Sequence, residues 1–95
     1  MRESSIKAEC TSNVYNRWGA VDDPKDLTVG KEYTVDYVVI HGSYTQTILV
    51  GDPEHAYNSC NFKFFDKDGK EIDIVDYFHH KIGTHDCWMK VACRP

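Results

Sequence analysis

The chain has 95 residues, of which 41% are hydrophobic and 13% aromatic, and its formal net charge is −4. Such a composition is typical of a folded globular domain, because disordered chains are poor in aromatic residues. The negative charge argues against duplex DNA or RNA as a partner, and no apolar run approaches the roughly 18 residues that cross a bilayer. We expect a single domain over residues 1–95, located in the cytoplasm.

The first part of the chain predicts one strand followed by a long loop. Ile6, Ala8 and Cys10 alternate with polar residues, which is the period of a half-buried strand. Residues 12–26 have no regular period and are rich in Asn, Gly and Asp. Long loops of this kind in compact domains are usually either functional or disordered.

Two strands joined by a short turn come next. After a turn around Gly30, Tyr33, Val35, Tyr37 and Val39 alternate with Thr34 and Asp36. By Val38 and Ile40 both faces are apolar, so we expect the far end of this strand to be covered on both sides. Residues 41–43 form a turn, and the β-branched residues of 44–50 predict a returning strand. Residues 51–54 then interrupt the pattern, because proline cannot donate to a strand ladder.

The next strand is expected to carry Cys60, Phe62 and Phe64 on one face. Residues 66–69 end in glycine and predict a tight turn, with 70–74 as the partner strand of the hairpin.

The C-terminal part predicts a helix and a last strand. Residues 73–82 fit a short helix with Asp73 as its N-cap and Gly83 just past its end. A strand would account for Ile72 and Ile74 but not for the residues that follow, so we favour the helix. Residues 87–93 alternate again and predict a final strand with a cysteine at each end of its buried face.

The run from Leu27 to Val35 reads Leu-Thr-Val-Gly-Lys-Glu-Tyr-Thr-Val. It resembles the opening of small SH3-like barrel proteins of bacteria and phages, most of them uncharacterised. The resemblance covers about residues 6–66 and leaves 67–95 as an extension peculiar to this chain. With the elements above, it implies a mainly β fold: a small SH3-like barrel of five to six strands with one short C-terminal helix. It implies no activity, because fold alone does not determine function.

Candidate metal ligands gather near the C-terminus, namely His79, His85, Cys87 and Cys93. Structural zinc sites usually present two closely spaced ligand pairs, and this chain contains no Cys-x-x-Cys. We therefore interpret the cysteines as small buried hydrophobic residues and expect no cofactor. A zinc-stabilised small domain is the alternative.

Cys10 and Cys93 would face each other if the first and last strands met. In the chain-entropy model, a disulfide there would contribute about 4 kcal/mol. A reducing cytosol would prevent it from forming.

No recognisable catalytic signature occurs in the sequence, so we expect a protein that is not an enzyme. The acidic and aromatic residues of the turn-rich segments predict instead a surface that binds another protein, because Trp and Tyr are enriched in binding hot spots and acidic groups suit a basic partner. The candidates are Tyr15, Trp18, Asp22, Asp23, Asp26, Tyr44, Asp52, Glu54 and Tyr57.

The resemblance to phage proteins makes an accessory or inhibitory role natural for such a surface. An acidic loop can compete for the basic groove of a nucleic-acid-binding enzyme. The alternative use of loop aromatics in a small barrel is to bind single-stranded nucleic acid.

Overall fold

The computed structural model describes residues 6–17, 19–78 and 88–93. Within these ranges the chain forms seven strands, one 3-10 turn and one short helix. These elements are β1 (Lys7–Cys10), β2 (Glu32–His41), β3 (Thr45–Leu49), β4 (Asp52–Asn58), η1 (Ser59–Asn61), β5 (Phe62–Phe65), β6 (Glu71–Ile72), α1 (Ile74–Tyr77) and β7 (Trp88–Ala92). The prediction of a mainly β fold with one short helix is confirmed.

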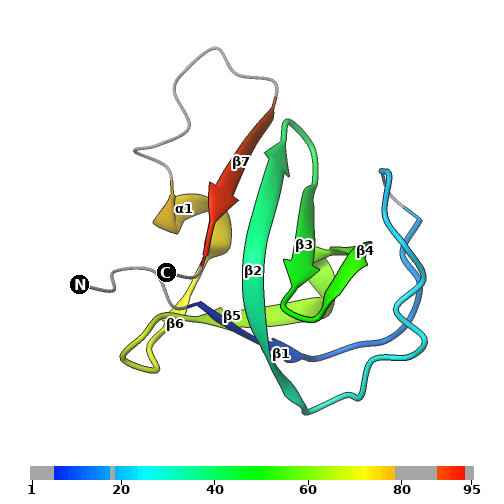
Figure 1. The fold of residues 1–95 in the computed structure, drawn as a ribbon, viewed down its shortest axis with the longest axis horizontal. Helices are drawn as coiled ribbons and strands as arrows, with labels where there is room; N and C mark the ends of the chain where they lie inside the picture. Colours follow the sequence, from blue (N-terminus) through cyan, green and yellow to red (C-terminus); the bar gives the residue numbers. More distant parts are fainter. Residues whose placement is uncertain (1–5, 18, 79–87, 94–95) are drawn as a thin grey trace.

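All the strands pair in antiparallel fashion around β2. The strand order is β4-β3-β2-β1-β5-β6, and β7 also pairs with β2. In Figure 1, β7, β2 and β3 stand side by side, and β5 runs across them. The outermost strands of this order, β4 and β6, do not pair with each other in the described part of the chain. The sheet therefore curls without closing into the barrel that the resemblance implied.

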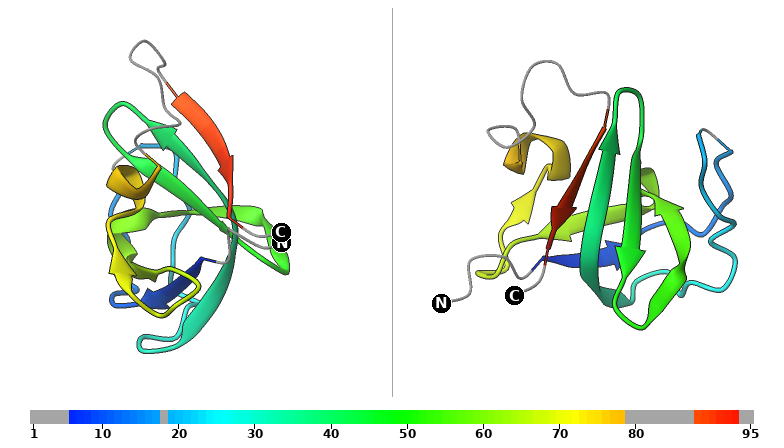
Figure 2. Two further views of the ribbon diagram at one scale, coloured as in Figure 1. Left: turned by 90° about the vertical axis from the view of Figure 1, so that its left-hand side faces the viewer. Right: turned by 45° about the horizontal axis from the view of Figure 1, so that its top comes forward.

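Strand β2 changes its partner along one edge at a bulge near Asp36. Its first residues pair with β1 and its last residues with β7, so these two strands follow one another along the same edge (Figure 2). The Ile6 amide donates to the Cys93 carbonyl (3.0 Å). The Cys93 amide donates to the carbonyl of Asp36 (2.9 Å), and the Val35 amide donates to that of Ile6 (3.1 Å). Both ends of the described chain are thus bound to the middle of β2.

The same bulge reverses which residues of β2 face the core. The pairing register with β3 shifts between Val35 and Tyr37. Val35 is buried, but the next buried residues are Val38 and Ile40. The sequence predicted that both faces are covered at this end of the strand. Val38 and Ile40 are buried, whereas Tyr37 and Val39 are half-buried, because one extra residue in a strand moves all later side chains to the opposite face.

The core gathers side chains from both ends of the chain and from the central strands. Its fully buried members include Ile6, Ala8, Val35, Val38 and Cys93. At one end of this core, the rings of Tyr57 and Phe62 meet edge to face, with their centroids 6.4 Å apart.

The strand β4 was not expected from the sequence. Residues 51–54 were predicted to interrupt the sheet, yet β4 begins at Asp52 and contains Pro53. Proline is tolerated there because β4 is the last strand at its end of the sheet, where a missing N–H breaks no central ladder. The predicted interruption over residues 51–54 thus coincides with the beginning of β4. Only Gly51, with φ of 87°, lies in the turn before this strand.

One cysteine prediction fails, and one open question about the cysteines is answered. Cys60 was expected on the buried face of a strand, but it lies in the η1 turn and is exposed. Cys10 and Cys93 are free thiols. Cys93 bonds to Ile6, and Cys10 lies four residues further along β1, or about 13 Å at the usual rise of a strand. The two therefore do not face each other.

The helix is shorter than predicted, but its start is confirmed. The Asp73 side chain accepts hydrogen bonds from the amides of Val75 and Asp76 (both 3.0 Å), as an N-cap does. Helix α1 ends at Tyr77. The expected C-terminal end at Gly83 lies outside the described residues.

We predict that Ile6→Ala lowers the free energy of unfolding by about 2–5 kcal/mol, because Ile6 is fully buried where the chain ends meet. The matched control is Val29→Ala, whose side chain is 54% exposed and which should change stability by no more than about 0.5 kcal/mol. Urea unfolding measures both. Equal effects of the two substitutions would contradict the placement of Ile6 in the core.

Candidate functional site

The long loop of residues 12–26 docks against the free edge of β4. The Asp22 amide donates to the Ala56 carbonyl (2.8 Å), and the Ala56 amide donates to Asp22 Oδ2 (2.7 Å). Asp22 thus exchanges two hydrogen bonds with Ala56, as two paired residues of neighbouring strands do. Its contacts cover an edge that would otherwise be open to pairing with another chain. In Figure 1 the loop runs alongside β4.

Further contacts hold the middle of this loop against the β2–β3 hairpin. Gln46 Nε2 donates to the carbonyl of Ala20 (2.6 Å). Gly19 lies directly on the ring of Tyr44, since a Cβ at this position would come within 2.6 Å of ring atoms. Its φ of 82° is also unfavourable for other residues. Glycine is therefore required where the loop crosses the hairpin.

The beginning of the loop is held by Asn61, which is almost completely buried. Its side-chain amide donates to the carbonyls of Ser12 (2.7 Å) and Val14 (3.1 Å). The Thr11 amide donates to the Asn61 carbonyl (2.8 Å). A buried side-chain amide must find partners, and here those partners fix the path of the loop.

The beginning of β4 carries a hydrogen-bonded group of three side chains. His55 Nδ1 donates to Asp52 Oδ1 (2.6 Å), and the Tyr57 hydroxyl donates to Asp52 Oδ2 (2.7 Å). The rings of His55 and Tyr57 stack with their centroids 5.8 Å apart. Residues 53–56 bulge out of the register between β3 and β4, and this bulge lets Asp52 reach both partners.

The bonds within this group shift the pKa of each member. The hydrogen bond with His55 lowers the pKa of the Asp52 carboxyl, and the same bond raises the pKa of the His55 imidazole. Burial, followed by the hydrogen bond to Asp52, raises the pKa of the Tyr57 hydroxyl. At neutral pH the group therefore holds an ionised carboxylate and a neutral phenol.

Other carboxylates act on the same group from the loop and from β4. Asp22 and Glu54 add to the raised pKa of His55, while Asp22 and Asp26 add to that of Tyr57. We call Asp22, Asp26, Asp52 and Glu54 the acidic face. Its members come from two segments far apart in sequence, and the docking of the loop on β4 brings them together.

The other predicted residues that the structure describes make local contacts of their own. Asp23 accepts a hydrogen bond from the Lys25 amide in a local turn (3.0 Å). Tyr15 bonds to the Val21 carbonyl (2.8 Å), and Tyr44 stacks on His41 with ring centroids 4.4 Å apart. Trp18 lies outside the described residues.

Tyr57 belongs to the site but does not form part of an exposed rim. Its side chain is only 4% exposed and packs in the core, so its contribution is to hold Asp52. His55 was not predicted as a site residue. The only signal in the sequence was that His55 lies three residues after Asp52. This spacing brings the two side chains together only because residues 53–56 bulge.

The surface also has a hollow away from the acidic face, between β5, β6 and the start of α1. It measures about 610 Å³, with Phe64 and Ile74 among its apolar lining residues. Lys63, Glu71 and Asp73 also line it, so it carries charges of both signs. It therefore favours no particular charge in a partner, unlike the acidic face.

Most of the predicted zinc ligands cannot be placed. His79, His85 and Cys87 lie outside the described residues. Cys93 is buried, and its thiol donates to the Val91 carbonyl (3.6 Å). The described ranges contain no group of three or more His, Cys, Asp or Glu residues able to hold a metal ion. They likewise contain no helix long and apolar enough to span a membrane.

Fold and site together define a small, mainly β protein with an acidic face at one end of its sheet. Residues 22–87 match a family described as bacteriophage T4 protein Y07B, and since this is more than half of the chain, the protein belongs to that family. No curated protein and no solved structure gives a significant match.

The family match confirms the expectation of a phage-type small protein. It also corrects one detail of the sequence analysis. The matched range continues to residue 87, so most of the segment 67–95 is shared with the family and is not peculiar to this chain. All four carboxylates of the acidic face lie within the matched range.

The Asp52–His55 pair predicts how stability depends on pH. The pKa of His55 is raised above its ordinary 6.5, so its contribution is complete below that pH and is lost as pH rises through the raised value. The pKa of Asp52 is lowered from 3.8, so its contribution is lost as pH falls through the lowered value. The pair therefore stabilises the fold most between about pH 4 and pH 6.5.

We expect His55→Gln to lower the free energy of unfolding more at about pH 5.5 than at about pH 8.5. Urea unfolding at low salt measures the difference, because salt weakens an exposed ion pair. The same loss of stability at both pH values would show that the pair contributes no charge interaction.

Proposed function

We propose that this protein is a non-catalytic binding module that uses its acidic face to engage a basic surface on another protein. The observation that carries the proposal is that the docked loop brings carboxylates of two segments together. Asp22 bonds to Ala56 of β4, next to His55, and Asp52 bonds to His55 and Tyr57. Asp26 lines the same hollow as Asp52. A cytoplasmic accessory or inhibitory role in a phage-infected cell would use such a surface. One such target is the basic groove in which a nucleic-acid-binding enzyme normally holds its nucleic acid.

Electrostatic complementarity supports this kind of partner. A surface of one sign attracts a surface of the other, which speeds association and selects among partners. The chain as a whole has a net charge of −4, so its overall field acts in the same direction. Glu54 and Asp26 are exposed and are free to make contacts at this surface.

The way the face is held also supports binding. A loop that becomes ordered only on binding loses conformational entropy at that moment, which weakens the complex. Here hydrogen bonds already fix the loop. Asp22 accepts from Ala56 of β4, Gln46 of β3 donates to the loop carbonyl of Ala20, and Asn61 donates to the carbonyl of Val14 near the beginning of the loop. The carboxylates are therefore arranged before a partner arrives.

The alternative of binding single-stranded nucleic acid receives less support. Bases need exposed aromatic platforms and a basic groove for the phosphates. Tyr57 is buried, and one ring face of Tyr44 stacks on His41 while Gly19 packs against its ring. The neighbouring carboxylates would repel phosphate groups.

We expect the double variant Asp26→Lys, Glu54→Lys to lose its partner. Immobilised protein is incubated with lysate of a bacterial host, and captured proteins are quantified by mass spectrometry. Recovery of the partner should fall on the order of tenfold or more, because like charges then face each other. Raising salt from about 0.1 M to about 1 M should weaken capture by the unchanged protein, since it shortens the Debye length.

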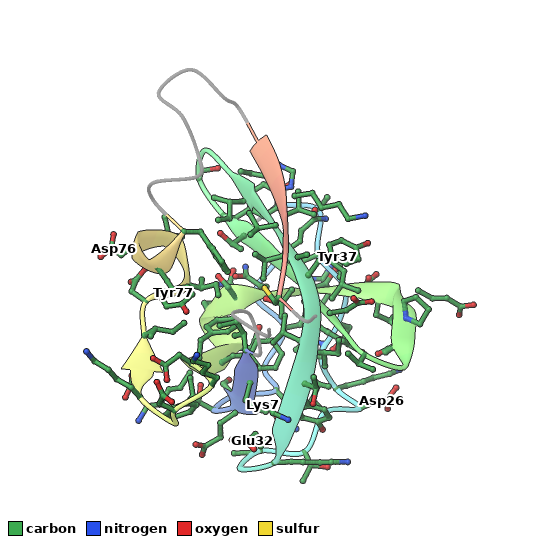
Figure 3. All side chains as sticks on the ribbon, turned by 60° about the vertical axis from the view of Figure 1, so that its left-hand side comes forward. Lys7, Asp26, Glu32, Tyr37, Asp76 and Tyr77 are labelled. Atoms are coloured by element: carbon green, nitrogen blue, oxygen red, sulfur yellow. The ribbon has the colours of Figure 1, made fainter. Side chains whose placement is uncertain are left out.

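The matched control is Asp68→Lys, Asp76→Lys, which changes the net charge by the same amount. Asp68 lies in the β5–β6 turn, and Asp76 lies on the opposite side of the molecule from Asp26 (Figure 3). This control should capture the partner as well as the unchanged protein does. Equal loss in both double variants, with both still folded, would show that net charge alone acts and would refute the proposed face.

A further inference from the structure

A hollow of about 370 Å³ adjoins the acidic face between the loop 12–26, the start of β2 and the β3–β4 turn. Pockets for small molecules measure about 300–1,000 Å³, so this hollow is at the low end of that range. Its size suits one large side chain of a partner better than a whole cofactor.

The walls of the hollow combine negative charge with aromatic and apolar surface. Asp26 and Asp52 supply the carboxylates and Lys31 an ammonium group. Tyr33 and the buried Tyr57 supply aromatic rings, and Val50 an exposed apolar side chain. Asp26 makes no hydrogen bond or ion pair to any other described residue. Both oxygens of Asp52 hold a partner already, but each carboxylate oxygen has a second lone pair and can accept another hydrogen bond.

These walls match a flat cation with several N–H donors. A guanidinium group donates several hydrogen bonds to carboxylates in a fixed planar arrangement, whereas an ammonium is a compact and strongly hydrated charge. The chain itself places one cation here, since Lys31 Nζ lies 5.1 Å from the centroid of the Tyr33 ring. Among the described residues Lys31 makes no ion pair with Asp26 or Asp52, so both carboxylates remain available to a second cation.

We propose that the hollow receives an arginine side chain from a basic segment of the partner protein. This inference rests on the proposed function and names the group that anchors the partner. The carboxylates of Asp26 and Asp52 accept hydrogen bonds from the guanidinium, and Val50 packs against its aliphatic stem.

The test is an NMR titration of the isotope-labelled protein with N-acetyl-arginine amide. We expect saturable shifts of backbone amides that line the hollow, at millimolar concentrations. The analogue N-acetyl-citrulline amide has nearly the same shape but no charge, and it should cause shifts at least tenfold smaller at the same concentration. N-acetyl-lysine amide should bind more weakly than the arginine compound.

Two single variants separate the hollow from the general charge of the molecule. Val50→Arg places a guanidinium of the chain itself at the hollow and should abolish the saturable shifts. Val75→Arg adds the same charge at a valine of similar exposure, 38% against 42%, but in α1. It should leave the titration unchanged.

Linear shifts without saturation, or equal shifts with the citrulline compound, would overturn the arginine site. So would equal loss in Val50→Arg and Val75→Arg. These failures differ from failure of the proposed function, which is tested by protein capture with Asp26→Lys, Glu54→Lys. If capture depends on the acidic face while the titration fails, only the arginine anchor is refuted.

Discussion

The bulge of β2 at Asp36 is the constraint on which the rest of the fold depends. At this point one edge of β2 passes from β1 to β7, and three backbone hydrogen bonds join Ile6, Cys93 and the residues of the bulge. A single long strand can therefore serve two groups of partners: β1 with β5 and β6, and β7 with β3 and β4. The bulge also turns Val38 and Ile40 into the core. Without it, the two ends of the chain would compete for the same edge.

The acidic face lies at the β4 end of the sheet and depends on a second bulge, in β4. Residues 53–56 bulge from the β3–β4 register, so that Asp52 reaches both His55 and Tyr57. The free edge of β4 then receives Asp22 from the loop. Covering an exposed edge and assembling a charged surface are thus achieved by the same contacts. This is the physical reason why a long irregular loop in a small domain can hold its carboxylates in fixed positions.

Much of the fold follows from local patterns in the sequence, whereas the details that build the site do not. Alternation predicts β1, the β-branched residues predict β3, and the Asp73 cap predicts the start of α1. The parity change in β2 could not be predicted, because it depends on where β1 and β7 meet. Strand β4 was missed because Pro53 and its polar neighbours hide any alternation. Composition pointed to the acidic residues, but the role of His55 depends on a bulge that has no local signal.

The central claim is that the acidic face is already assembled in the free protein by the docking of the loop on β4. Amide hydrogen exchange at Ala56 tests this most directly, because its amide has Asp22 Oδ2 as its partner. We expect the Ala56 amide to be protected in the unchanged protein and to exchange much faster in Asp22→Ala, while the amides of β3 keep their protection. If the Ala56 amide of the unchanged protein exchanged as fast as an exposed turn amide such as that of Lys67, the face would not be preformed.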